Sequence, residues 1–446
     1  MIPPKPSARA GTVGLLAYAR AFRADILSAQ PARLYRAWMA EFRTPFFRSY
    51  MMNDPALIDL VLLQRPDDFP KSDRVREGLA PLLGRSVFVT NGAEWKRQRR
   101  IIDPAFAGGR LRDAFPGMLD AAAAMVARQE DGEHEVERLA SYAAADVIFR
   151  TLFSVPIEDR LAAQVFAEFR AYQRSQPLLN LAALVPLPRW LPRPHRRGTL
   201  AAARSIRAAI AALVERRGAQ IAAGTAPDDL ATKIMTFADP ETGHRFSPGE
   251  MVDQVAIFFL AGHETSASAL AWALYLLATH PDAQDRVAAE AARDWDGMAI
   301  GDLSRLPFTR DVFRETLRLY PPVPMMVRQT TRPESFRDRA APKGAQVVLS
   351  PWHLHRHERL WDDPDGFDPD RWGRAATAES ARRAYMPFSA GPRVCTGAGF
   401  AMAEGVVLLA RMIAAFRVAP VGPPPVPVAH LTVRARDGIR LRFARR

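Results

Sequence analysis

The single cysteine of the chain, Cys395, stands in a loop whose composition suits a metal-bound thiolate. Residues 388–397 read F-S-A-G-P-R-V-C-T-G, which fits the pattern F-x-x-G-x-R-x-C-x-G, and an amphipathic segment follows over 398–416. A cysteine where a glycine-rich loop enters a helix lies near orphan N–H groups and the positive end of the helix dipole, which favour a thiolate. Gly391 and Gly397 leave room beside this cysteine for a flat, bulky group, and Arg393 supplies a cation there. We therefore interpret Cys395 as a metal ligand rather than as the small buried hydrophobic residue that a lone cysteine usually is.

A second group of reactive residues interrupts the most apolar part of the chain. Residues 247–250 read S-P-G-E, a capping box with proline at the first helical position, and they predict a helix over 248–280. Within this helix, residues 261–266 read A-G-H-E-T-S. Polar groups in a buried helix cost free energy unless they line a cavity or meet partners. Glu264 and Thr265 are therefore either a satisfied polar kink or a functional pair beside a cavity.

The composition excludes several classes of protein. The chain has 446 residues, of which 48% are hydrophobic, so it can bury a large core and is not disordered. One cysteine permits no internal disulfide, zinc ribbon or multi-cysteine iron–sulfur site. The formal net charge of +13 indicates an anionic partner without choosing between nucleic acid, an anionic membrane and an acidic protein.

The elements that must position these residues are mostly helical. Long segments rich in alanine, leucine and arginine predict helices from about residue 108 to 292, and strand patterns appear late, at 345–349 and in a hairpin over 433–443. No internal repeat or cut point is visible. We expect one large α-rich domain over 1–446 with a small β portion and an irregular N-terminus over residues 1–12.

The chain shows no sequence pattern of a signal peptide or a membrane span. The apolar stretch 14–18 is too short for either, and the window 255–278 contains His263 and Glu264, which favours a buried helix. A cytoplasmic location is the default expectation. The proline-broken apolar connector 177–191 is either a packed loop or a lip over an apolar cavity that touches a membrane surface.

Together these motifs resemble those of one family. The cysteine loop resembles the haem-binding loop of cytochromes P450, and A-G-H-E-T resembles the A-G-x-E-T oxygen-activation motif of that family. Three further segments agree with the family pattern: W-x-x-x-R at 95–99, E-x-x-R at 315–318 followed by a proline run, and F-D-P-D-R-W at 367–372. The five motifs occur in family order from Trp95 to Gly397 and span most of the chain.

The resemblance implies a cytochrome P450 fold with a haem b group between the long central helix and the helix after the cysteine loop. Cys395 would be the axial thiolate, with Phe388 beside the sulfur, and Glu264 and Thr265 would deliver protons to dioxygen. Further cofactor contacts would come from Trp95, Arg99, Arg328, Gly391, Arg393, Gly397 and Ala261. A buried charged network behind the loop would consist of Glu315, Arg318 and Arg371.

The resemblance also implies a monooxygenase that hydroxylates or epoxidises a lipophilic molecule such as a fatty acid, terpenoid or steroid. The residues expected to face the substrate pocket are Ala261, Val323, Met325, Met326 and Val327. No flavin or ferredoxin domain is visible in the sequence, so electrons are expected from an acidic ferredoxin or flavodoxin with an NAD(P)H-dependent reductase. The enzyme is expected to be a monomer without a transmembrane segment.

Three alternatives remain at this level. A nucleic-acid-binding protein would explain the charge, but the arginines are dispersed and no groove-reading motif is present. A metal hydrolase could use His353, His355 and His357, whose alternation on a strand would place three imidazoles on one face, although no H-E-x-x-H pattern accompanies them. A haem-thiolate peroxygenase, isomerase or dehydratase on the same fold is closer, and the Glu264–Thr265 pair argues against it.

Overall fold

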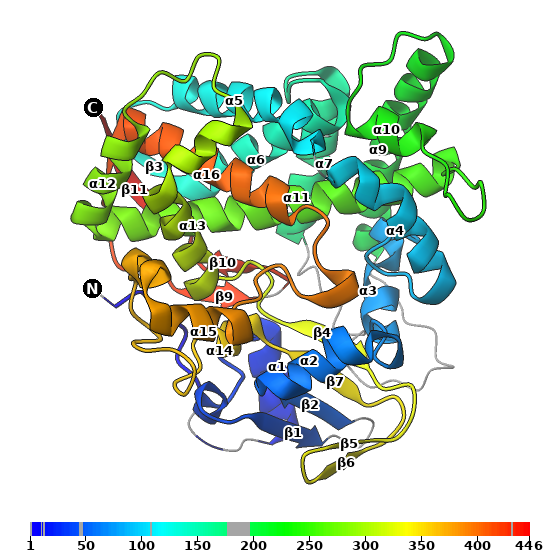
Figure 1. Cartoon of the computed structure of the whole chain (residues 1–446), viewed down its shortest axis with the longest axis vertical. Helices are drawn as coiled ribbons and strands as arrows, with labels where there is room; N and C mark the ends of the chain where they lie inside the picture. The colour runs from blue at the N-terminus through cyan, green and yellow to red at the C-terminus, as the bar shows by residue number, and fades with distance from the viewer. Residues whose placement is uncertain are drawn as a thin grey trace.

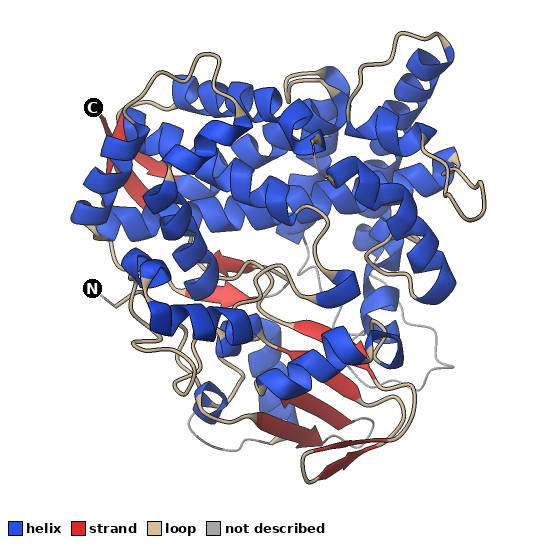
Figure 2. Ribbon diagram, viewed as in Figure 1, coloured by secondary structure: helices blue, strands red, loops and turns tan. Residues whose placement is uncertain are grey.

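The computed structural model describes residues 2–9, 11, 14–43, 48–107, 109–175, 197–429 and 431–446. The predicted connector 177–191 lies outside the described residues. Helices form the larger part of the molecule, and a four-stranded sheet lies at the end that carries α1 and α2 (Figures 1 and 2). This arrangement confirms the predicted mainly helical fold with a small β portion.

The helices include most of the segment predicted to be helical. Their bounds are α1 Leu15–Ala24, α2 Pro55–Asp59, α3 Asp73–Leu83, α4 Gly92–Phe106, α5 Arg110–Arg128, α6 Val136–Phe153, α7 Arg160–Ser175, α9 Arg197–Ala222, α10 Leu230–Thr236, α11 Pro248–Thr279, α12 Pro281–Ala291, α13 Pro307–Leu319, α14 Pro351–Leu354, α15 Ala375–Ala384 and α16 Ala398–Ala415. Short helical turns are η1 Ala32–Tyr35, η2 Leu60–Gln64, η3 Pro66–Asp68, η4 Ile300–Arg305, η5 Pro369–Gly373 and η6 Gly391–Arg393.

The strands form small separate sheets. Their bounds are β1 Met39–Arg43, β2 Arg48–Met52, β3 Gly132–Glu135, β4 Met326–Gln329, β5 Glu334–Phe336, β6 Arg339–Ala341, β7 Gln346–Leu349, β8 Phe416–Pro420, β9 Pro427–Ala429, β10 Val433–Ala435 and β11 Arg440–Arg445. The largest sheet has the order β1-β2-β7-β4, in which only β2 and β7 pair in parallel. The other described sheets are β3-β11-β8, β9-β10 and β5-β6.

The central helix α11 follows the sequence prediction closely. Ser247 accepts a hydrogen bond from the backbone N–H of Glu250, and the Glu250 side chain accepts from the N–H of Ser247, which completes the capping box. The helix ends at Thr279, and its residues are buried on all sides along most of its length. Trp272 stacks on Tyr320 of the neighbouring chain segment with a ring separation of 4.0 Å. Burial on every side is what an apolar helix through a protein core requires.

The predicted hairpin over 433–443 is wrong in its pairing, although both strands exist. β10 pairs with β9, whereas β11 lies between β3 and β8. Gly438, with φ of +78°, makes a turn that separates the two sheets instead of joining two neighbouring strands. Leu441 and Phe443 are buried and alternate as expected, but alternation identifies only the buried face of a strand and not its hydrogen-bonding neighbour.

The histidine run at 353–357 does not form the strand that a three-histidine metal site would need. Ser350 caps a short helical turn, α14, and this turn sends the three rings to different partners. His353 bonds to the Ser350 hydroxyl, His355 lies 3.2 Å from the Arg318 carbonyl oxygen, and His357 stacks on Trp38. No group of three potential metal-ligating side chains occurs among the described residues.

A buried charge network ties α13 to the segment that leads toward the cysteine loop. The Glu315 carboxylate accepts hydrogen bonds from Arg318 Nε at 2.9 Å and from Arg371 Nε at 2.9 Å, and all three side chains are at most 3% exposed. The remaining guanidinium N–H groups of the two arginines donate to backbone carbonyls, among them those of His355 and Asp362. Two cations on one carboxylate are tolerated in the core because carbonyl dipoles satisfy the rest of their donors.

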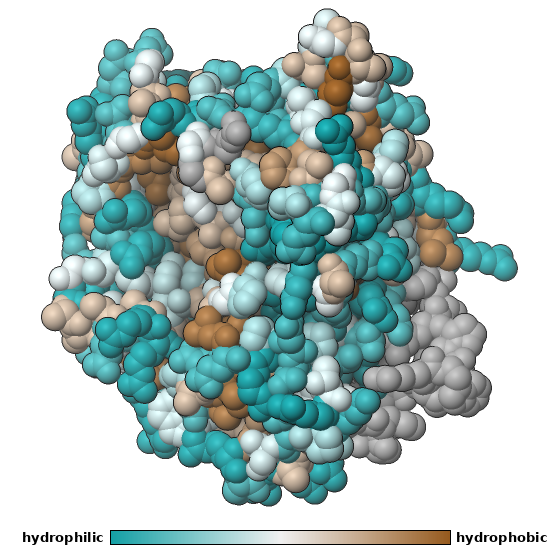
Figure 3. Space-filling model, turned by 45° about the vertical axis from the view of Figure 1, so that its right-hand side comes forward, coloured by the Kyte–Doolittle hydropathy of each residue, from teal (hydrophilic) through white to brown (hydrophobic). Residues whose placement is uncertain are grey.

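Few of the large hydrophobic side chains among the described residues are exposed at the surface of the protein. The face in Figure 3 is mainly hydrophilic, with small hydrophobic groups scattered among polar ones. The exposed large hydrophobic residues among those described are Ile2, Leu63, Phe237, Val394 and Val426.

Removal of one partner of the Glu315 network should destabilise the protein strongly. Arg371→Ala leaves part of the charge on Glu315 uncompensated in the core, and we expect it to lower the free energy of unfolding by about 3–5 kcal/mol. Asp370→Asn is the matched control because Asp370 and Arg286 form an ion pair in which both side chains are more than half exposed. The control should cost less than about 1 kcal/mol. Equal losses for the two variants in urea denaturation would contradict the structural role of the network.

Candidate active site

The cysteine loop is held by backbone hydrogen bonds on both sides of Cys395. The N–H of Cys395 donates to the carbonyl of Phe388 at 2.9 Å, and its own carbonyl accepts from the N–H of Ala398, the first residue of α16. The loop thus delivers Cys395 to the N-terminal end of α16, as the pattern predicted.

Gly391 shapes this loop through a close backbone contact. Its φ is +70°, and a Cβ at this position would lie 2.0 Å from the carbonyl oxygen of Leu62 in η2. A side chain is therefore excluded by the neighbouring backbone, which explains this glycine without a bound group. A Cβ at Gly397 would contact nothing within 4 Å among the described atoms, so this position leaves open space at the start of α16.

The Cys395 thiol is accessible, although protein atoms surround it closely. Burial raises the pKa of this thiol, while the N–H of Gly397 and the charges of Arg99 and Lys71 oppose the rise. The expectation that the helix terminus alone would favour a thiolate is therefore incomplete, because desolvation of the anion outweighs it here. A metal ion that binds the sulfur would supply the missing positive charge and release the proton.

Four cationic side chains gather around Cys395: Lys71, Arg99, Arg328 and Arg393. Burial, followed by the charges of Arg328, Arg393 and Arg99, lowers the pKa of Lys71 well below its usual range. Burial lowers the pKa of Arg328 to about 10, and burial with the charges of Arg328 and Arg99 lowers that of Arg393 to about 9. Buried cations that repel one another favour an anionic ligand. The charge cluster therefore suits a group with carboxylates.

Trp95 and its neighbours orient two of these arginines. The guanidinium of Arg393 lies 4.1 Å from the ring centre of Trp95 and donates to Asn91 Oδ1 at 2.8 Å. One turn further along α4, Arg99 donates to Asp103 Oδ2 and to the carbonyl of Val394, both at 2.8 Å. The W-x-x-x-R spacing therefore places a ring and a cation against the cysteine loop through the helical repeat.

Lys71 was not identified from the sequence. It lies in an isolated bridge between residue 71 and Arg328 of β4, with its ammonium 3.5 Å from the ring centre of Phe88. The chain contains only five lysines among its 61 basic residues, and this scarcity was the one available indication in the sequence.

The motif in α11 presents different residues to different sides of the helix. Ala261 is exposed although most residues of α11 are buried, and Thr265 donates its hydroxyl proton to the carbonyl of Ala261 at 2.5 Å. Thr265 therefore bonds back to its own helix, one of the two arrangements considered from the sequence. A Cβ on Gly262 would lie 2.3 Å from Ile148, so this glycine permits the close approach of α6.

Glu264 is buried and held by the C-terminal strands. Its carboxylate accepts a hydrogen bond from the Thr432 hydroxyl at 2.6 Å and forms an ion pair with Arg434 of β10. The side chain of Glu264 is 3% exposed. The sequence did not predict either partner, because they lie some 170 residues further along the chain.

The predicted substrate-pocket residues do not all pack against the same hydrophobic cluster. Met326 packs against the cluster that contains Tyr50 and Leu349, whereas Met325 packs against the cluster of Leu34 and Met51. Met325, which precedes β4, also packs against the large cluster that contains Trp272 and Tyr320. Val323 and Val327 are partly exposed.

A buried acid that the sequence analysis did not single out joins α11 to α16. Ser266 donates its hydroxyl proton to Glu404 Oε2 at 2.6 Å, and Glu404 Oε1 has no hydrogen-bond partner among the described residues. Burial raises the pKa of Glu404 to about 8, so this carboxyl is mainly protonated at neutral pH. The only indication of Glu404 in the sequence was that an acidic residue stands alone in the apolar stretch after the cysteine loop.

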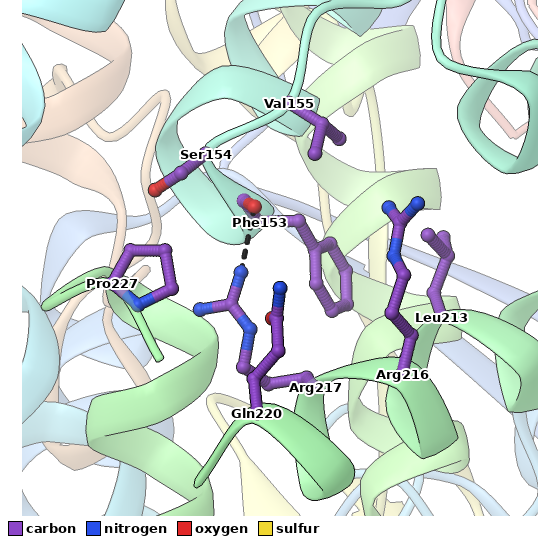
Figure 4. Close-up of a pocket in the computed structure, with 8 residues that line it drawn as sticks. All are labelled: Phe153, Ser154, Val155, Leu213, Arg216, Arg217, Gln220 and Pro227. Carbon is purple, nitrogen blue, oxygen red and sulfur yellow. Dashed lines mark hydrogen bonds between the residues drawn. The ribbon is translucent and has the colours of Figure 1, made fainter. Parts of the chain in front are cut away.

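A small pocket that shares no residue with the cation cluster near Cys395 lies between the end of α6 and α9 (Figure 4). Its volume is about 150 Å³, and Arg217 on its wall donates to the carbonyl of Phe153 at 2.7 Å. Arg217 also pairs with Asp229 at 2.5 Å, and Arg216 pairs with Asp159 at 2.9 Å. Because carboxylates already neutralise both arginines, this pocket shows no charge that a ligand would have to balance.

One described helix, α16, is long and apolar enough to span a membrane by length and composition. It follows the cysteine loop and is mostly buried inside the molecule, as the core helices of many proteins are.

Comparison with known proteins agrees with this geometry. The Cytochrome P450 family matches residues 38–442 of the chain. Cyclooctat-9-en-7-ol 5-monooxygenase of Streptomyces melanosporofaciens is 32% identical over 394 residues, which cover 86% of this chain and 83% of that protein. Cytochrome P450 4A11 of Homo sapiens is 32% identical over 418 residues, which cover 86% and 78% respectively. The crystal structure of the cytochrome P450DA heme domain is similar with a TM-score of 0.83 and 25% identity, covering 100% of this chain and 98% of that one.

The fold and the cysteine loop define a haem-thiolate enzyme. The chain belongs to the cytochrome P450 family and is a P450 monooxygenase, as the five motifs predicted.

The raised pKa of Glu404 predicts a pH-dependent stability. The folded state keeps the Glu404 proton up to about pH 8, whereas an unfolded glutamate loses it near its ordinary value of 4.5. The contribution of Glu404 to the free energy of unfolding, measured as the difference between wild type and Glu404→Gln, should therefore fall as the pH rises from about 5 to 8, by up to about 1.4 kcal/mol per pH unit. Glu404→Gln, which does not titrate, should lack this fall, and Glu379→Gln at an exposed position should retain it. A constant difference between wild type and Glu404→Gln at pH 5.5 and 8 would show that Glu404 does not titrate in this way.

Proposed function

We propose that this P450 binds haem b through Cys395 and inserts oxygen from dioxygen into a lipophilic small molecule. The observation that carries the proposal is the accessible thiol at the start of α16 with four clustered cations around it. Haem b carries an iron that accepts one thiolate and two propionates that require cations, and this donor set fits both. Arg99, Arg328, Arg393 and Lys71 would hold the propionates, with Trp95 supporting the guanidinium groups.

Once bound, a haem-thiolate iron activates dioxygen, because the thiolate donates electron density that favours O–O cleavage. The residues of the protein position the reacting groups and supply protons to them. Thr265 holds a hydroxyl beside the exposed Ala261, and Glu264 keeps a carboxylate one residue away, fixed by Arg434 and Thr432. In this proposal the two side chains hand protons toward the face of α11 that carries Ala261.

The substrate class follows from the apolar surroundings and from the relatives. Ala261, Val323 and Val327 are apolar and at least partly exposed, which favours a lipophilic ligand over a charged one. The printed name of one relative describes a monooxygenase of cyclooctat-9-en-7-ol, an unsaturated alcohol. We propose a substrate of the fatty acid, terpenoid or steroid type.

Electrons are proposed to come from an acidic ferredoxin or flavodoxin with an NAD(P)H-dependent reductase. Near Cys395, Val394 is 37% exposed and Leu63 is 50% exposed, which supplies an apolar contact for a docked protein. Two arginines of α4, Arg97 and Arg100, already pair with Glu250 and Asp239. Lys96 is the better candidate for a contact with an acidic donor, because its ion pair with Asp67 is solvent-exposed, with side chains 51% and 75% accessible.

Replacement of the proposed ligand tests the haem assignment. Cys395→Ser should lose the thiolate-type spectrum of the reduced carbon monoxide complex, because a hydroxyl is a far weaker and less electron-rich ligand than a thiolate. The wild type, purified in the same way, should show this spectrum. An unchanged spectrum in Cys395→Ser would refute the assignment of Cys395.

Charge reversal tests the docking surface. We expect Lys96→Glu to raise the KM for a plant-type ferredoxin several-fold, and we expect the wild-type rate of reduction to fall as the salt concentration rises. Arg442→Glu is the control, since Arg442 is exposed on β11, which lies at the opposite side of the molecule from α4 in Figure 1. Equal effects of the two reversals, or a rate that does not depend on salt, would exclude electrostatic docking near Cys395.

A further inference from the structure

A polar pocket of about 200 Å³ lies on the side of α11 that carries His263 and Glu264. Around the helix axis Glu264 lies between Ala261 and His263, because residues three apart in the sequence are about 60° apart and neighbours are about 100° apart. At the outer end of the pocket, Glu135 and Arg138 are exposed, whereas His263 and Glu264 at the inner end are at most 3% exposed. The pocket therefore connects solvent with the buried acid of the A-G-x-E-T motif.

Arg434 links two acids inside this pocket. It forms an ion pair with Glu264, and its charge lowers the pKa of Glu137, although other effects on Glu137 are larger. Glu137 Oε1 accepts a hydrogen bond at 2.9 Å from the N–H of Ala435, the residue after Arg434. Glu137 on α6 and Glu264 on α11 thus contact consecutive residues of β10.

The inner end of the pocket also carries an unsatisfied polar atom. His263 Nε2 lies 2.7 Å from the hydroxyl oxygen of Ser141, whereas His263 Nδ1 has no hydrogen-bond partner among the described residues. Burial, followed by the charges of Arg434 and Arg170, lowers the pKa of His263 to about 3, so the ring is uncharged at neutral pH. A buried nitrogen without a partner beside a polar cavity favours ordered water there.

We propose that this pocket is the route by which protons from solvent reach Glu264, that Glu137 is the acid that takes them up, and that Arg434 positions Glu264. The inference rests on the proposed function, in which reduction of one oxygen atom to water consumes protons. A proton from bulk water would bind the Glu137 carboxylate, pass through water in the pocket to Glu264, and leave toward Thr265. Glu137 would return to its anionic form and be protonated again from solvent.

The charges that face Glu137 allow it to exchange protons near neutral pH. Burial raises the pKa of Glu137 to about 7, the charge of Glu135 adds to the rise, and the Ala435 N–H and Arg434 oppose it. The other titratable or charged groups of the pocket are Arg138, Arg170, His263 and Glu264. An acid that is half protonated near the working pH is suited to pass protons in either direction.

Infrared titration of the haem-loaded protein tests the acid directly and needs no substrate. In a Glu404→Gln background, which removes the carboxyl that titrates near pH 8, a protonated carboxyl band should disappear with a midpoint near pH 7, and the further change Glu137→Gln should abolish this band. Glu133→Gln is the matched control, because Glu133 is on the neighbouring strand β3, is exposed and pairs with Arg442 outside the pocket. A band that titrates unchanged in Glu137→Gln would overturn the assignment.

Turnover measures the consequence. With a plant-type ferredoxin and its reductase as donor and dodecanoic acid as probe, Glu137→Gln should consume NADPH several-fold more slowly and lose the wild-type pH dependence around 7. Arg434→Gln should increase peroxide release, and Arg434→Lys should restore coupling in part. Wild-type pH profiles in both Glu137→Gln and Arg434→Gln would refute the route. A wild type without the thiolate-type carbon monoxide spectrum would instead refute the proposed function itself.

Discussion

The Glu315 carboxylate, buried between Arg318 and Arg371, is the interaction on which the cysteine site depends. Arg318 donates to the carbonyl of His355, and the ring of His355 in turn accepts a hydrogen bond at 2.9 Å from the N–H of Met386. Met386 lies two residues before Phe388, whose carbonyl holds the N–H of the cysteine. Two buried hydrogen bonds and the short segment from Met386 to Phe388 therefore connect the charge network on α13 to the ligand loop.

This connection gives the histidine run a structural meaning. His355 accepts from one backbone segment and lies against the carbonyl of another, so it joins α13 to the segment before the loop. Burial, with the charge of Arg318 as the next cause, lowers the pKa of His355 to about 3, which keeps the ring neutral and able to accept. A rigid support of this kind matters for a thiolate site. Burial of the ligand and of the charges around it costs desolvation free energy, so the protein must hold them in place.

Electrostatic balance also distinguishes the surroundings of Cys395 from those of Glu264. Around Cys395 the protein gathers cations that lower one another's pKa values, and an anionic cofactor would relieve this repulsion. On the side that carries Glu264, by contrast, acids and arginines are paired across β10 and α6. The surroundings of Cys395 therefore favour an anionic group, whereas the charges around Glu264 are already balanced.

The sequence by itself determined the family and the central helix, and it pointed to the residues that are proposed to react. The capping box of α11, the W-x-x-x-R spacing and the cysteine loop depend on local geometry, in which neighbours a few residues apart determine the outcome. The pairing of β10 and β11, the partners of Glu264 and the position of Lys71 were decided only by the tertiary structure, because they depend on contacts between segments far apart in the chain. The pKa values of Cys395 and Glu404 were decided there too, since desolvation depends on how completely the folded chain excludes water from each group.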